Sequence, residues 1–369
     1  MKISPKTHKA IISLAIAFLT LIAGFWMNKF IIKPDYSLAI FISIKIFLLI
    51  VSFLAIIILS FFIYKQSKRK KLLNFTLCIS SILTIIILLE LVFTLYTPST
   101  NDFGDFSNKI WLKKHFTPIN KLGYRDTEPK NNPEKKNILV IGDSFVAGHG
   151  VKTDEMFTNL LKTKLAMNYS IFNLGVCGSH TQREYDSLLS YPVQPDIIIL
   201  AYYHNDIESA MNAKGISPNI TNPKDELCAF SRLFVNNSLF FNYMFTKYAK
   251  SKISAQFMES KNNDILAYLN EDLWQKQTEY LDNFYNYSIE NNVRLIIIFF
   301  PAMGEGITFT HELAGVKLEE YCIDKGIQYL DLYPKIQNLE VYERVANPMD
   351  HHPSAEVNSI IADLITENL

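Results

Sequence analysis

The stretch "NILVIGDSFVAGHG", residues 137–150, contains the pattern that decides the fold. Its first residues, 137–141, are mostly apolar and run into Gly142, Asp143 and Ser144. A short apolar run bounded by turn residues is typical of a buried strand, and glycine marks the tight turn at its end. The stretch therefore predicts a strand whose carboxyl end carries a functional turn.

Apolar strands and amphipathic helices alternate around this stretch. The predicted strands are residues 137–141, 169–174, 196–203, 294–300 and 327–332, and the predicted helices are 154–167, 180–190, 271–291, 313–324 and 354–367. This alternation predicts an α/β fold with a mostly parallel sheet covered on both faces, whose ligands bind at the carboxyl ends of the strands. Residues 215–268 interrupt the alternation and predict a helical excursion, with a lid or substrate wall as the alternative.

Several readings of the turn fail on spacing. The glycines do not fit G-x-G-x-x-G, no Gly-Lys-Ser/Thr follows, and Val146 stands where the second glycine of G-x-S-x-G belongs. Five histidines lie near predicted strand ends without a metal-ligand spacing: His149, His180, His204, His351 and His352. We therefore expect no metal and no cofactor. A nucleophile remains, because Ser144 would lie near a helix N-terminus that favours developing negative charge.

Four ordered blocks resemble those of the SGNH/GDSL hydrolases. They are "GDSF" (142–145), "NLGVCG" (173–178), "ND" (205–206) and "DHHPS" (350–354). The resemblance covers residues 137–369 and implies a three-layer α/β/α, flavodoxin-like SGNH domain. It implies a catalytic triad of the serine nucleophile Ser144, the general base His352 and the orienting carboxylate Asp350. It also implies an oxyanion hole made of the Ser144 and Gly178 backbone N–H groups and the Asn205 side chain.

The sequence departs from the family pattern at two blocks. Tyr203 and His204 precede Asn205 where a glycine is usual, and the acid of the last block stands one residue closer to its histidine than in Asp-x-x-His. We expect His352 rather than His351 to be the base, because Pro353 holds the residue before it extended. Asp350 would then lie on the same face of the loop.

Two residues outside the triad have open roles. Asp206 is expected to hold its loop rather than act chemically. Arg125, within "INKLGYRD" (119–126), could bind an anionic substrate group, with an ion pair to the domain as the favoured alternative.

Three long apolar runs precede the domain, at residues 10–32, 38–64 and 72–96. Each is long enough for a helix to cross a bilayer, so residues 1–96 are predicted to form three transmembrane helices. A cleaved signal peptide is the alternative for the first run, although that run is long and no small-residue cleavage site follows it. Lys45 and Glu90 would lie within the second and third helices, where we expect them to pair.

Lysine and arginine near the helix ends set the orientation. The N-terminus and the loop "KQSKRKK" (65–71) are basic, which favours the cytoplasmic side for both. Residues 97–136 would then be an extracytoplasmic linker, and residues 137–369 would face the outside. The formal net charge is zero, so nucleic acid is not expected as a partner. A disulfide between Cys228 and Cys322 and free thiols both stay open.

The sequence thus predicts a multi-pass protein of the cytoplasmic (inner) membrane. Its extracytoplasmic domain would be a serine esterase that hydrolyses ester-linked acyl groups of a small molecule, lipid or glycan. The alternative is an O-acyltransferase or deacetylase of envelope polysaccharide, because transfer and hydrolysis share an acyl-enzyme. An inactive SGNH-like scaffold is the third hypothesis. The acyl chain, the acceptor alcohol and the pathway are not encoded in these patterns.

Overall fold

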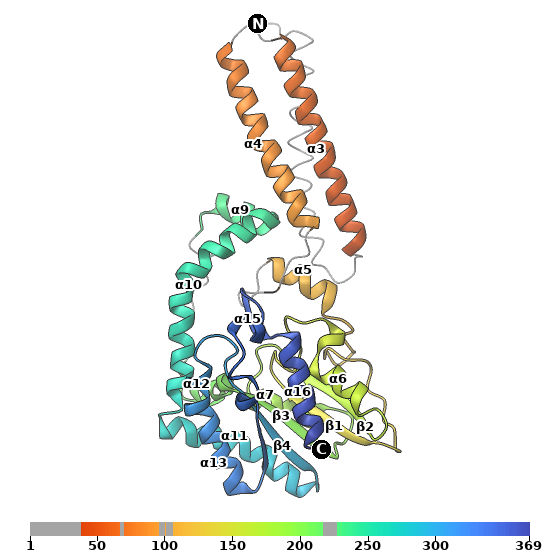
Figure 1. Cartoon of the computed structure of the whole chain (residues 1–369), viewed down its shortest axis with the longest axis vertical. Coiled ribbons are helices and arrows are strands. Elements are labelled where there is room, and N and C mark those ends of the chain that lie inside the picture. The colour runs from red at the N-terminus through yellow and green to blue at the C-terminus, as the bar shows by residue number, and fades with distance from the viewer. Residues whose placement is uncertain (1–37, 67–69, 96–99, 101–105, 217–226) are drawn as a thin grey trace. The chain divides into compact units, whose positions relative to one another are not determined.

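The computed structural model describes residues 38–66, 70–95, 100, 106–216 and 227–369 (Figure 1). The described residues divide into two compact units. The sheet unit holds residues 100, 115–216 and 252–369, and the helical unit holds residues 38–66, 70–95, 106–114 and 227–251. The first predicted membrane run, residues 10–32, lies outside the described residues.

Parallel strands form the centre of the sheet unit, in the order β2-β1-β3-β4-β5. Their bounds are β1 Lys136–Gly142, β2 Tyr169–Gly175, β3 Ile197–Tyr203, β4 Arg294–Phe300 and β5 Gln328–Asp331. Each predicted strand is therefore present to within one residue at either end. The order reverses at β1, with β2 on one side and β3 on the other, which is the flavodoxin-like arrangement. The predicted α/β class is confirmed for this unit.

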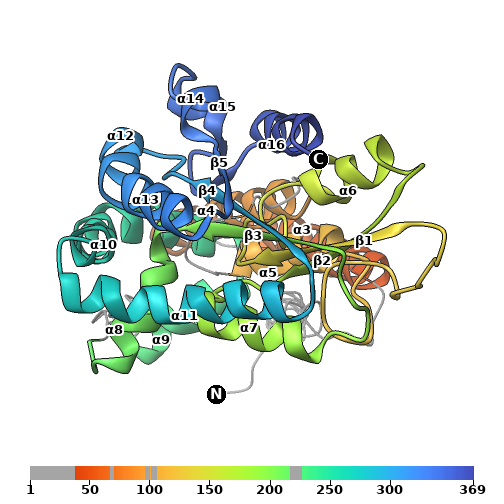
Figure 2. The same cartoon turned by 90° about the horizontal axis from the view of Figure 1, so that it is seen from below.

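Helices cover both faces of the sheet because side chains alternate along each strand. Leu139 and Ile141 pack into one core with α7, α11 and α13, whereas Ile138 and Val140 pack into a second core with α6 and α16. The bounds of these helices are α6 Phe157–Lys164, α7 Thr181–Ser190, α11 Glu271–Glu290, α13 Val316–Lys325 and α16 Ala355–Glu367. Figure 2 shows α7 and α11 along one face and α6 and α16 along the other.

Several short elements complete the sheet unit and escaped the sequence analysis. They are α8 Glu208–Ala213, α12 Ile307–Thr310, α14 Tyr333–Ile336, α15 Val341–Arg344, β6 Val345–Asn347 and β7 Asp350–Pro353. The last two pair antiparallel as a hairpin. This hairpin carries the "DHHP" block.

The helical unit is built mainly from two long helices, α3 Leu38–Gln66 and α4 Lys70–Leu95. It also contains α5 Phe106–His115 up to residue 114, α9 Ala229–Asn237 and the first part of α10 Leu239–Ala267. Helix α5 lies within the predicted linker, so that segment is not loop throughout. Helices α9 and α10 confirm the predicted helical excursion.

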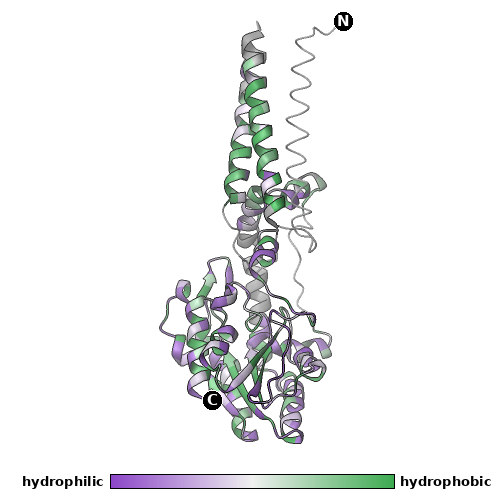
Figure 3. Ribbon diagram, turned by 90° about the vertical axis from the view of Figure 1, so that its right-hand side faces the viewer, coloured by the Kyte–Doolittle hydropathy of each residue, from purple (hydrophilic) through white to green (hydrophobic). Residues whose placement is uncertain are grey.

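The surfaces of α3 and α4 are apolar, as Figure 3 shows. Phe47, Phe61, Ile85 and Leu95 are each more than half exposed. Among the described residues, one window, Cys78–Leu95, is long and apolar enough to cross a membrane, with a mean hydropathy of 2.5; α3 contributes the shorter apolar stretch Ile42–Ile58. The prediction of three membrane helices therefore stays a prediction.

The predicted pairing of the two charges in these helices is confirmed. Lys45 Nζ donates to Glu90 Oε1 at 2.6 Å, and neither side chain has any solvent exposure. All four cysteines belong to the described part of the chain and are free thiols, with Cys228 exposed and Cys322 buried.

Candidate active site

The turn after β1 is fixed by its small and acidic residues. A Cβ on Gly142 would lie 2.6 Å from the Val146 side chain and 3.0 Å from the Ala201 carbonyl oxygen, so only glycine fits there. The buried Asp143 carboxylate accepts the Phe145 N–H at 2.8 Å and closes the turn. Ser144 is consequently presented at the carboxyl end of the central strand, half-buried.

The structure brings Ser144, His352 and Asp350 together in one hydrogen-bonded chain. Ser144 Oγ lies 2.8 Å from His352 Nε2, and His352 Nδ1 lies 2.5 Å from Asp350 Oδ1. The Asp350 side chain is fully buried, and 16% of the His352 side chain is exposed. The geometry is that of a nucleophile, its base and the carboxylate that orients the base.

Strand β7 determines which of the two adjacent histidines reaches the serine. Successive side chains of a strand point to opposite faces, so Asp350 and His352 share one face. His351 lies on the other side, against the loop after β4, because a Cβ on Gly304 would be 3.1 Å from its ring. The Asp350 carboxylate also accepts the backbone N–H of His352 at 3.1 Å. The expected choice of His352 agrees with this geometry.

A second histidine, His149, lies beside the triad carboxylate. Its Nδ1 is 3.3 Å from Asp350 Oδ2, and its ring centroid is 4.3 Å from that of His352. Gly148 and Gly150 on either side have positive φ of 67° and 89°, which turns the loop back onto the hairpin. Sequence reasoning weighed this histidine only as a metal ligand. The sequence signal that could have indicated a tight turn at His149 was the glycine on either side of it.

Two imidazoles make the environment of Asp350 favourable for a charge. Burial would raise the pKa of Asp350, but the contacts that the carboxylate makes with the His149 and His352 rings outweigh burial and hold the pKa below its usual range. Asp350 is therefore ionised at neutral pH, where it fixes the proton of His352 on Nδ1. The unprotonated Nε2 then faces the Ser144 hydroxyl.

His149, Asp350 and His352 also place their ligand atoms within 4.8 Å of one another, as a metal site would. Both ring nitrogens of His352 already have partners, one in Asp350 and one in Ser144. A metal bound there would displace the hydrogen bond to the serine.

The expected oxyanion residues lie on the strands that flank β1. Gly178 follows β2 and Asn205 follows β3, and both strands pair with β1. Gly178 is exposed with a φ of 70°, and a Cβ there would meet no atom within 4 Å. The Asn205 Oδ1 atom is buried and has no hydrogen-bond partner among the described residues.

The loop around Asn205 is held by groups that do not reach the reacting atoms. Asp206, fully buried, accepts the Tyr203 N–H at 2.8 Å, as expected for a loop-holding residue. Tyr268 donates its hydroxyl to the His204 carbonyl at 2.9 Å. Tyr203, one of the two residues that stand where a glycine is usual, is accommodated by packing of its ring against Phe145, with ring centroids 4.4 Å apart.

Asn173 and Gly175 of β2 brace the serine loop. The Asn173 side chain donates to the Val146 carbonyl at 2.8 Å and accepts the Gly175 N–H at 2.8 Å. A Cβ on Gly175 would lie 2.1 Å from the Ala147 nitrogen. The second block therefore sets the position of the loop that carries Ser144.

Arg125 contacts backbone carbonyls of the serine loop rather than a carboxylate. Its guanidinium is 1% exposed and donates to the carbonyls of Gly148, Val151 and His115 at 2.5, 3.0 and 2.7 Å. Burial lowers the pKa of Arg125 to about 10, which still leaves the group charged at neutral pH. Arg125 is thus a clamp on the loop beyond Ser144, and it forms no ion pair with the residues that the structure describes. Its neighbour Asp126 pairs with Lys162.

Solved structures with a similar chain path are distant in sequence. A member of the lipolytic protein G-D-S-L family from Veillonella parvula is 13% identical, with 63% of this chain and 96% of that chain covered and a TM-score of 0.38. The psychrotrophic esterase EstA from Pseudoalteromonas sp. is 13% identical with the same coverage and a TM-score of 0.37. A carbohydrate acetylesterase family member from Sinorhizobium meliloti is 15% identical, also over 63% and 96%, with a TM-score of 0.37.

The description of the Veillonella protein names the family that the four sequence blocks resemble. No protein-family model matches the chain, and no curated protein matches it. The functional conclusion therefore rests on the geometry of Ser144, His352 and Asp350.

Proposed function

We propose that this chain is a membrane-anchored serine hydrolase of the SGNH/GDSL type that cleaves ester-linked acyl groups. The observation that carries the proposal is the hydrogen-bonded chain from Ser144 Oγ through His352 to Asp350, with distances of 2.8 and 2.5 Å. The four blocks that resemble the family all lie at the carboxyl ends of strands or on the hairpin, which supports one common site.

The chemistry follows from where the protons lie. Ser144 Oγ attacks the ester carbonyl carbon while His352 Nε2 takes the hydroxyl proton, and Asp350 stabilises the resulting imidazolium. The tetrahedral oxyanion would accept hydrogen bonds from the Ser144 and Gly178 N–H groups and the Asn205 amide. His352 then returns the proton to the leaving alcohol. Water, activated by the same ring, releases the acid and restores Ser144.

The membrane anchor is the second part of the proposal. A water-facing surface rarely exposes the continuous apolar area that α3 and α4 present, where Phe47, Ile82 and Leu95 are each more than half exposed. Lipid is the medium in which such a surface is stable. With the basic loop at residues 65–71 on the cytoplasmic side, the sheet unit would act outside the cytoplasm.

The direct test is turnover of acyl esters by the purified full chain in detergent. Ser144→Ala should abolish release of the acid from a chromogenic short-chain ester. The matched control is Ser190→Ala, which removes an exposed hydroxyl at the end of α7 and should leave the rate unchanged. Adding a soluble sugar acceptor separates hydrolysis from transfer, because an acyltransferase would yield the acylated sugar instead of the acid. An unchanged rate in Ser144→Ala would refute the hydrolase.

A further inference from the structure

The junction between α9 and α10 is tied to the middle of the apolar surface of α4. Glu90 Oε2 accepts the Ser238 hydroxyl at 2.6 Å and the Phe240 N–H at 3.1 Å, and Glu90 Oε1 accepts the Leu239 N–H at 3.0 Å as well as Lys45. Glu90 is therefore the N-terminal cap of a helix almost 150 residues later in the chain. The contact lies inside the helical unit.

The depth of this contact follows from the helix rise. Glu90 lies five residues before the end of α4 at Leu95, or ~8 Å at 1.5 Å per residue. Phe234 of α9 packs against the cluster of Leu49, Ile56 and Ile87. Ile87 is the member of this cluster on α4, about one turn before Glu90. Phe93 of α4 faces the ring of Tyr243, with centroids 4.9 Å apart. Helix α9 and the first turns of α10 thus lie at the level of the last two to three turns of α4.

The same turns of α4 carry exposed apolar side chains on their free face. Leu88, Val92 and Leu95 are 45%, 49% and 64% exposed. If α4 crosses a membrane, these residues contact acyl chains, and a segment packed beside them at the same level contacts acyl chains too. The segment itself exposes large hydrophobic side chains, as a contact with acyl chains requires. Leu233, Met244 and Tyr248 are 49%, 52% and 57% exposed.

Many backbone groups of the junction have partners within the helical unit, which suits a lipid environment, where water does not satisfy them. At the start of α10, Glu90 takes the first two N–H groups and Ser238 Oγ takes the Phe241 N–H at 3.1 Å. At the end of α9, the carbonyls of residues 233, 234 and 235 accept from the Asn237 side chain, the Ser238 N–H and the Asn242 side chain. Helix ends in water usually leave several of these groups to solvent.

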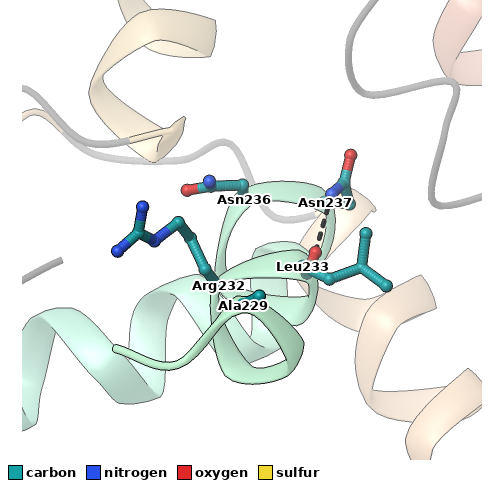
Figure 4. A pocket seen from close by; sticks show the side chains of 5 residues that line it. All are labelled: Ala229, Arg232, Leu233, Asn236 and Asn237. Carbon is teal, nitrogen blue, oxygen red and sulfur yellow. Dashed lines mark hydrogen bonds between the residues drawn. The ribbon is translucent and has the colours of Figure 1, made fainter. Parts of the chain in front are cut away.

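One side of α9 is polar and suits the headgroup layer. Figure 4 shows Arg232 and Asn236 extending together from one side of the helix, with Leu233 and Asn237 on the other. They line a hollow of about 350 Å³ together with Ala229. Phe234, two residues from Arg232, projects to the opposite side of the helix. This is the division expected of a helix that lies at a membrane interface.

We propose that residues 229–246, comprising α9, the junction and the first turns of α10, form a re-entrant element embedded in the outer leaflet beside α3 and α4. Its partner is the bilayer itself, and Glu90 is the positioning residue that holds it there. The inference rests on the proposed membrane anchor, because the depth is measured along α4. It adds a second membrane contact, made by a segment that interrupts the hydrolase-like part of the chain.

The test is depth-dependent quenching in the full chain reconstituted into phospholipid bilayers. In a background with the four native cysteines replaced, a fluorophore is attached at Met244→Cys, at Leu88→Cys or at Ile323→Cys. Ile323 is a matched apolar control that is 69% exposed on α13 of the sheet unit. Nitroxide lipids labelled near the headgroup should quench the first two positions to a similar extent and leave the third bright.

The outcomes separate the inference from the anchor on which it rests. Quenching at Leu88 without quenching at Met244 would overturn the re-entrant element and keep the anchor. Absence of quenching at Leu88 would overturn both. If only an aqueous quencher reaches Met244, the segment faces water and the inference is refuted. Cross-linking between two copies at this position would make the surface a protein contact and would refute it too. Glu90→Ala should reduce the quenching at Met244 and leave that at Leu88 unchanged. If Glu90 did not position the segment, the quenching at Met244 would not change.

Discussion

Asp350 in the sheet unit and Glu90 in the helical unit are both carboxylates with no solvent exposure, yet their partners differ in kind. Asp350 faces two imidazoles, whose protons can move during a reaction. Glu90 faces an ammonium group, a hydroxyl and two backbone N–H groups, whose protons stay in place. Burial makes either charge costly without partners. The chemistry of the partners then distinguishes a carboxylate that serves catalysis from one that holds two segments together.

The sharpest contrast on the Asp350 side is between the two adjacent histidines. His352→Ala should lower kcat by several orders of magnitude, because it removes the only ring in contact with Ser144 Oγ among the described residues. His351→Ala should stay within about tenfold of the parent, a change of ~1.4 kcal/mol. Steady-state hydrolysis of one ester by both variants decides the matter, and an exchange of these behaviours would refute the assignment.

On the Glu90 side the expected effect is on stability rather than on chemistry. Glu90→Ala should destabilise the helical unit by roughly 3–5 kcal/mol, because it leaves the Lys45 ammonium buried without its partner. Adding Lys45→Met should recover part of that loss, since the orphan charge is then gone. Hydrogen exchange at the Leu239 and Phe240 amides, with the chain in detergent, reports the change. Protection that is the same in parent and Glu90→Ala would mean that Glu90 does not cap α10.

His149 tests whether the second partner of Asp350 matters. We expect His149→Phe to lower kcat by about tenfold, ~1.4 kcal/mol, with a smaller effect on KM. Because the contact with His149 helps hold the pKa of Asp350 low, its loss raises that pKa toward the usual range. Asp350 then takes up a proton only as the pH falls toward the usual carboxyl range, so the loss should be larger at about pH 4 than at pH 8. His149→Gln keeps a donor and should recover part of the acid-side activity. A pH-independent loss would contradict the role.

The smallest expected effect comes from a third buried carboxyl, Glu184 of α7. Both its oxygens are buried and have no hydrogen-bond partner among the described residues. Burial, followed by the negative charges of Asp206 and Asp143, raises the pKa of Glu184 well above its usual value. A raised carboxyl pKa means that folding favours the protonated form, so stability is present at acid pH and is lost as the pH rises.

Glu184→Gln should therefore stabilise the full chain at neutral pH and make little difference below about pH 4, where the carboxyl is protonated in both states. The expected rise is a few degrees in the midpoint of the sheet-unit transition, since about 1 kcal/mol shifts it by roughly 2–4 °C in a domain of this size. Thermal scans at both pH values measure it. A gain of equal size at the two pH values would exclude the electrostatic cause.

The sequence predicted best what depends on local pattern. The strand positions follow from short apolar runs, and the extended conformation of His352 follows from Pro353. The β6–β7 hairpin was missed because residues 345–353 contain two prolines, an asparagine and no continuous apolar run, so its pairing comes from tertiary packing. Helix α5 was missed for a similar reason, because polar residues surround it.

The errors of role concern contacts between distant segments. Two carbonyl partners of Arg125, those of Gly148 and Val151, lie more than 20 residues later in the chain, and no local pattern indicates that they converge on it. His149 contacts Asp350 only because the serine loop and the hairpin meet at one edge of the sheet. The pairing of Lys45 with Glu90 was foreseeable, because two opposite charges in apolar helices have few other partners. The capping of α10 by the same Glu90 was not.

The most direct test of the central claim is covalent labelling of Ser144 by a fluorophosphonate in the full chain. The account predicts one adduct, on the peptide that contains Ser144, formed in the parent and in His351→Ala and strongly reduced in His352→Ala. Digestion and mass spectrometry locate the adduct. Labelling that persists in Ser144→Ala, or an adduct on another residue, would contradict the assignment of Ser144 as the nucleophile.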